Sequence, residues 1–130
     1  MSNVPCAAAV VFVDDVPRLT AFYQMLANMT LLHADEQHAV LEMPGLQLTI
    51  HALRPPRKDR DGMYPARKAT HIKLCFPVTS ITGARVTAAS MGGEVWPPKK
   101  EWDAVDRGFR ACDGRDPEGN IFQVRQPLTR

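Results

Sequence analysis

The sequence predicts an α+β domain of two βαβββ modules whose curved sheets leave a concave face between them. Three observations predict this fold. The order of strand, helix and three strands occurs twice, the two helices share one apolar phase, and a charged, proline-rich stretch lies between the halves. We place module one at about residues 5–53, the linker at 54–69 and module two at about 70–126, within a single domain of 130 residues.

Module one begins with a strand and a capped helix. The run Ala7–Val13 is small and β-branched, as in a strand, and it leads into Asp14 and Asp15. An acidic residue with a proline soon after it, in the first turn, is typical of a helix start. The predicted helix covers about residues 17–26, where apolar side chains recur at helical spacing: Val16, Leu19, Phe22, Tyr23 and Leu26. Three extended runs follow, MTLLHA, HAVLEM and LQLTIHAL, and a Pro-Gly turn joins the last two.

Module two repeats this order after the linker. The stretch RPPRKDRDGMYPARKA has no apolar period, which indicates a surface connection. Ile72, Leu74 and Phe76 then alternate with other residues as in a strand, and a helix of small residues follows from Ile81 to a Gly-Gly pair. Aligning Val16 with Ile81 superposes the two helices. Three more extended runs complete the module: GEVWP, GFRACD and NIFQVRQ.

Composition narrows the class of protein. The net charge is +2 and the isoelectric point 8.6, which argues against nucleic acid as the main partner. Cys6, Cys75 and Cys112 form no CxxC pair, so they predict neither a disulfide framework nor a zinc knuckle, and they favour a reducing cytoplasm. The N-terminus has no basic region, and its apolar run is too short for a secretory signal or a membrane span.

The motif DPEGN, residues 116–120, gives a more specific indication. Asp and Pro favour a turn, Gly119 allows a positive φ, and Asn120 opens an alternating strand. Together with the opening VVFVDDVPRLTAFYQML and the repeated plan, this motif resembles the vicinal oxygen chelate superfamily, which contains glyoxalases, bleomycin resistance proteins and dioxygenases. The resemblance covers nearly the whole chain. It implies a glyoxalase-like fold, in which eight strands form a cupped arrangement around a central cavity.

The resemblance also implies a divalent metal between the modules, held by the first and last strands of each. Its first position corresponds here to Ala8, which cannot bind a metal, and its second to Gln47. The final strand offers Gln123 where the family usually has a glutamate. The third position is His71, or Lys73 if the strand is aligned without a gap; strand alternation puts both on one face.

This set contains no anionic ligand, so we predict no bound metal and no other cofactor. A displaced divalent-metal site using His51 with His71, Gln47 and Gln123 stays open as an alternative. Without a metal, His71 is the best candidate for a catalytic base, although a half-buried structural histidine is equally ordinary. The residues expected to line the cavity or bind a ligand are Gln47, His71, Lys73, Gln123, Trp102 and Phe109.

The preferred function is therefore a cytoplasmic protein of glyoxalase/bleomycin-resistance type that binds a small, aromatic or anionic molecule. The ligand would lie in the cavity between modules or in a groove of a homodimer, as the resemblance implies. The alternative is a metal-dependent enzyme, either a lyase or isomerase of glyoxalase type or an extradiol-type dioxygenase. Nucleic-acid binding by the basic linker ranks last, and we expect neither a nucleic acid nor a membrane as partner.

Overall fold

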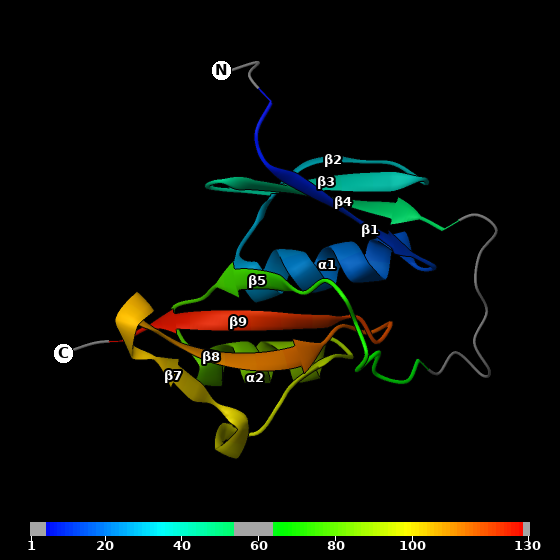
Figure 1. The fold of residues 1–130 in the computed structure, drawn as a ribbon. Helices are drawn as coiled ribbons and strands as arrows, with labels where there is room; N and C mark the ends of the chain where they lie inside the picture. The colour runs from blue at the N-terminus through cyan, green and yellow to red at the C-terminus, as the bar shows by residue number, and fades with distance from the viewer. Residues whose placement is uncertain (1–4, 54–63, 129–130) are drawn as a thin grey trace.

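A computed structural model describes residues 5–53 and 64–128 (Figure 1). It contains two helices and two mixed sheets, one of four strands and one of five. This arrangement confirms the predicted α+β fold of two modules. The predicted linker falls largely on residues outside the described ranges. Within the described ranges, no helix has the length and apolar character needed to cross a bilayer.

Module one contains β1 (Ala8–Val13), α1 (Val16–Ala27), β2 (Thr30–Ala34), β3 (His38–Met43) and β4 (Leu46–Ala52). Its strands are ordered β1-β4-β3-β2, with β1 parallel to β4 and the remaining pairs antiparallel. The carboxylate of Asp15 caps α1 by accepting a hydrogen bond from the Arg18 backbone N–H. Asn28 ends the helix in the left-handed conformation, with φ of 53°.

Module two contains β5 (Leu74–Pro77), α2 (Ile81–Ser90), β6 (Glu94–Val95), β7 (Trp102–Ala104), β8 (Phe109–Arg115) and β9 (Ile121–Pro127). Two 3₁₀ turns, η2 (Pro98–Lys100) and η3 (Val105–Arg107), flank β7. The strands are ordered β5-β9-β8-β6, and β7 also pairs with β8. Two details differ from the sequence prediction: β7 is an additional strand, and β5 begins at Leu74, so that His71 precedes it.

The core lies on one face of each sheet and is continuous between the modules. α1 lies between the two sheets in Figure 1; it packs against β3 and β4 of the first sheet and against α2, and its aromatic rings reach the second sheet. Its Tyr23 is 2% exposed and contacts the rings of Phe76 in β5 and Phe122 in β9. The aromatic contacts of one helix with the strands of the other module therefore fix the two halves against each other.

The DPEGN turn also joins the modules. The Glu118 carboxylate accepts hydrogen bonds from the backbone N–H groups of Asp14 (2.8 Å) and Asp15 (2.8 Å), at the start of α1. Asp116 is fully buried and accepts a hydrogen bond from the Tyr23 hydroxyl. The motif therefore has a structural role in addition to forming the β8–β9 turn.

The opposite face of each sheet is open. In β1, Val10 and Phe12 point away from the core and are 51% and 56% exposed. In module two, Gln123 and Arg125 alternate with the core residues Phe122 and Val124 and so lie on the opposite face, where Arg125 is half-buried and Gln123 is covered to 4% exposure. We call these surfaces the module-one face and the module-two face.

Candidate functional site

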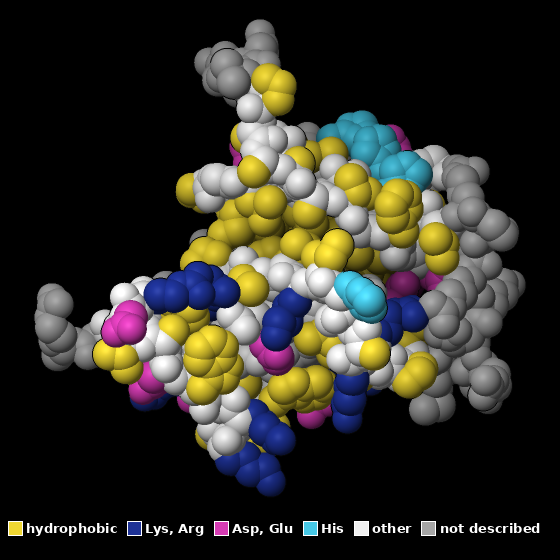
Figure 2. Space-filling view, in the orientation of Figure 1, with side chains coloured by type: hydrophobic (Ala, Val, Ile, Leu, Met, Phe, Trp, Pro, Cys, Tyr) yellow, Lys and Arg dark blue, Asp and Glu magenta, His cyan; other side chains and the backbone are white. Residues whose placement is uncertain are grey.

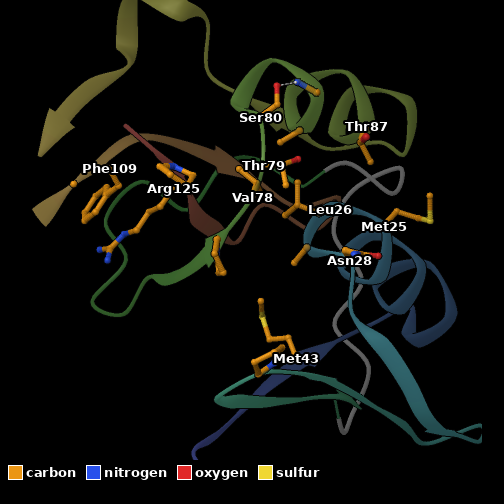
Figure 3. A pocket seen from close by; sticks show the side chains of 17 residues that line it. Met25, Leu26, Asn28, Met43, Val78, Thr79, Ser80, Thr87, Phe109 and Arg125 are labelled. Carbon is orange, nitrogen blue, oxygen red and sulfur yellow. Dashed lines mark hydrogen bonds between the residues drawn. The ribbon is translucent and has the colours of Figure 1, made fainter. Parts of the chain in front are cut away.

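A groove separates the two modules at one side of the molecule and has a volume of about 940 Å³ (Figure 3). The end of α1 and the β3–β4 turn form one wall, with Met25, Leu26 and Met43. The other wall is formed by the start of α2. The groove is mainly apolar, and Figure 3 places Phe109 and Arg125 together at one of its ends.

Arg125 connects this groove with the module-two face. Its guanidinium carbon lies 4.4 Å from the centre of the Phe109 ring, and its Nε donates to the Gln123 side-chain oxygen at 2.7 Å. Arg107 approaches the same ring at 5.0 Å, and Trp102 contacts its edge with ring centres 6.2 Å apart. Phe109 and Arg125 therefore line the end of the groove, and a second guanidinium group and a second aromatic ring contact Phe109 beside it.

A hydrogen-bonded network continues from Arg125 across the module-two face. The Gln123 amide donates to Asp113 Oδ1 at 3.0 Å, and Lys73 Nζ donates to Asp113 Oδ2 at 2.7 Å. Strand pairing explains this arrangement, because Gln123 is opposite Asp113 in β8 and beside Cys75 in β5. Two cations and one carboxylate thus share one partly exposed surface.

Comparison with solved structures shows that this architecture has a precedent. No family model and no curated protein sequence matches the chain. A glyoxalase/bleomycin resistance protein/dioxygenase family enzyme from Burkholderia phytofirmans is similar with a TM-score of 0.69 and 15% identity, covering 94% of this chain and 98% of that one. The chain has the glyoxalase fold.

Two further structures share the glyoxalase fold. One is a mutant of the fosfomycin resistance protein FosX from Listeria monocytogenes, solved with Mn(II) and 1S,2S-dihydroxypropylphosphonic acid. It has a TM-score of 0.65 and 17% identity, covering 98% of this chain and 93% of that one. The other is an integron cassette protein from Vibrio cholerae, with a TM-score of 0.60, 20% identity, and 97% of each chain covered. Identities this low show a common fold only.

The central metal that the glyoxalase fold implies does not fit the side chains present. Ala8 and Gln47 are paired neighbours on the module-one face, and the Gln47 amide donates to Glu42 at 3.1 Å. On the module-two face both polar atoms of the Gln123 amide already have partners, Asp113 and Arg125. A lysine ion pair lies beside them, and a cationic side chain opposes the binding of a dication. We therefore derive no reaction step through a metal at this place.

The structure brings four of the six expected ligand-binding residues together in module two: Lys73, Gln123, Trp102 and Phe109. It separates Gln47, which lies on the module-one face. His71 and Lys73 are both exposed and both precede β5, but of the two only Lys73 is seen to join the network, through its contact with Asp113. The Cys75 thiol contacts the Lys73 carbonyl at 3.8 Å. His51 belongs to the module-one face, where its ring stacks against His38 at 5.9 Å.

Asp113 and Arg125 are the two members of this network that the sequence did not predict. The positions of both could have been predicted from the strand register. The DPEGN turn fixes the β8–β9 hairpin, and counting outward from it places Asp113 opposite Gln123. Arg125 lies two positions beyond Gln123 and therefore on the same face.

Proposed function

We propose that the protein binds a small anionic molecule that carries an aromatic or planar group, without a central metal ion. The observation that carries this proposal is the network of Lys73, Asp113, Gln123 and Arg125, whose member Arg125 also lines one end of an apolar groove. A guanidinium recognises carboxylates and phosphonates through paired hydrogen bonds, and a lysine adds a second positive charge. Phe109 and Trp102 offer ring surfaces to the planar part of the ligand.

The first experiment measures binding of phenylphosphonate and benzoate by isothermal titration calorimetry, with benzyl alcohol as the uncharged comparison. Arg125→Gln should weaken binding of both anions by about tenfold, the effect of losing one charge-assisted contact. Arg110→Gln is the matched control, because Arg110 is exposed and paired with Asp103 at 2.7 Å. Equal affinity for the anions and the alcohol, or equal loss in both variants, would contradict the proposal.

Metal analysis tests the second part of the proposal. Protein purified without a polyhistidine tag should contain no metal that depends on Gln123. A stoichiometric metal that is lost in Gln123→Ala and kept in His38→Ala would place an ion in the centre of the fold and refute the metal-free site.

We further propose that the protein is a homodimer in which the module-one face of one copy covers the module-two face of the other. Val10 and Phe12 are too apolar for a surface that stays in water, and Ile72, near the start of β5, is 77% exposed. The faces are also complementary in charge. Glu42 lies on the module-one face, and the module-two face carries Lys73 and Arg125.

Light scattering after size exclusion tests the dimer. The wild type should have the mass of two chains at micromolar concentration, and Phe12→Glu should have the mass of one. Val86→Glu is the control, since Val86 is 67% exposed on α2, away from both faces. A monomeric wild type, or a dimer that Phe12→Glu leaves intact, would contradict this arrangement.

A further inference from the structure

A group of histidines lies on module one, in and beside the β2–β3 hairpin, away from the network described above (Figure 2). His33 Nε2 is 2.8 Å from Asp35 Oδ2, and His38 Nδ1 is 3.3 Å from Asp35 Oδ1. The rings of His33 and His38 are tilted against each other with centres 4.8 Å apart. Their three potential ligand atoms all lie within 4.8 Å of one another.

A β-bulge in β2 makes this convergence happen. Leu31 pairs with Leu41, but the next pair is His33 with Val40, so Leu32 is an extra residue. Without the bulge, His33 would be opposite Ala39, which is 1% exposed and belongs to the core. The extra residue instead aligns His33 with the residues of the module-one face, where His38 lies.

We propose that His33, Asp35 and His38 form a binding site for a divalent transition-metal ion such as Zn²⁺. Zinc bonds to nitrogen and oxygen are about 2.0–2.2 Å long, so a tetrahedral ion keeps its ligands roughly 3.3 Å apart. The separation of His33 Nε2 and Asp35 Oδ2, 2.8 Å, is below this value, and no two of the three ligand atoms are more than 4.8 Å apart. Small rotations of the imidazoles, exposed in His33 and half-buried in His38, are enough to reach it, and a water molecule completes the coordination.

The hairpin already orients the carboxylate. Asp35 Oδ1 accepts hydrogen bonds from the backbone N–H groups of Gln37 (2.8 Å) and His38 (3.0 Å). This leaves Oδ2, the oxygen beside His33, to bind the ion. Backbone groups that hold a ligand in place in this way raise the affinity of metal sites.

The ligand chemistry selects the class of metal. Two imidazoles and one carboxylate suit zinc, nickel or copper, whereas magnesium and calcium require more oxygen ligands. All three side chains come from one turn of six residues. The ion would therefore link the two strands at the turn of the hairpin and stabilise its bulged conformation.

Isothermal titration calorimetry of Zn²⁺ into protein without a polyhistidine tag tests the site. The wild type should bind one ion per chain, and His33→Ala and His38→Ala should each lose about tenfold or more in affinity. Asp35→Asn should lose affinity as well, although its amide oxygen still accepts the two backbone hydrogen bonds of the turn. Circular dichroism of each variant verifies that the fold is kept.

Two other histidines provide matched controls. His51 stacks on His38 but lies outside the group of three, and His71 lies in module two. His51→Ala and His71→Ala should bind Zn²⁺ as the wild type does. No binding by the wild type would overturn the proposal, as would binding that survives in His38→Ala or disappears in His71→Ala.

Discussion

The Tyr23 hydroxyl offers the sharpest test of how the two modules are joined. Tyr23 in α1 donates to the carboxylate of Asp116 in the DPEGN turn, and both residues are buried. Burial, followed by the charge of Asp116, raises the pKa of Tyr23 well above its ordinary value, so the hydroxyl remains a donor throughout the neutral range. Tyr23→Phe removes this donor and leaves the ring in place.

The structure sets the magnitude of the effect. Asp116 keeps three other donors, the Glu118 N–H at 2.8 Å and two groups of Asn120 at 3.0 Å. The ring of the substituted residue still packs against Phe76 and Phe122. The loss is therefore that of one buried hydrogen bond to a charged group, about 1.5–3 kcal/mol in the free energy of unfolding.

Urea denaturation followed by circular dichroism measures this loss. The midpoint should fall and the slope of the transition should stay unchanged, because the buried area hardly differs. Tyr64→Phe is the control. The Tyr64 hydroxyl also donates to a carboxylate, that of Asp14 at 2.8 Å, but this hydrogen bond is only half-buried, so that water can replace it. A loss below about 0.5 kcal/mol in Tyr23→Phe, or an equal loss in both variants, would refute this account.

Glu118, two glycines and two cysteines give three further tests of the structure. Burial raises the pKa of the Glu118 carboxyl group, so its proton stabilises the folded chain below pH 4.5, and this contribution is lost as the pH rises through the folded pKa. The difference in the free energy of unfolding between wild type and Glu118→Gln should therefore shrink over that pH range. A difference that does not depend on pH would contradict the raised pKa. Gly114→Ala should lower the free energy of unfolding by about 1–3 kcal/mol, because a Cβ at this position meets the β6 backbone. Gly83→Ala should raise it by about 0.5–1 kcal/mol, because Gly83 is inside α2 and a Cβ there makes only ordinary contacts with Ser80. Urea denaturation measures both changes. Iodoacetamide should modify exposed Cys6 in the native protein and spare Cys112, whose thiol pKa is raised by burial, as mass spectrometry would detect.

The order of elements could be predicted because it depends on local patterns. Helix periodicity, the capping aspartate and the Pro-Gly turn are properties of short segments, and the structure confirms each of them. The start of β5 depends on a distant segment instead. Leu74 pairs with Phe122, and an extension back to His71 would need partners within the tight turn at Gly119, where φ is 87°. The alternating pattern around His71 therefore continues beyond the end of its partner strand.

The residues of the candidate site also differ in whether a local pattern predicts them. Gln123 was accessible from the DPEGN motif, and Lys73 from alternation along its strand. Trp102 lies outside the strands that the sequence predicts, but it belongs to β7, because that segment pairs with β8. The histidine group was not predicted. A bulge of one residue decides on which face of the sheet His33 lies, and no local sequence pattern in β2 indicates that bulge.

The charge balance on the module-two face determines how it can bind an anion. Any carboxylate or phosphonate must compete with Asp113 for Lys73 and with Gln123 for Arg125. Asp113→Asn removes the competing charge and keeps a side chain of similar shape. At the effective dielectric of a protein surface, removal of one charge at this range is worth about 1 kcal/mol or more, so affinity for phenylphosphonate should rise about fivefold. Calorimetry would decide, and unchanged or weaker binding would mean that the anion does not bind beside Lys73.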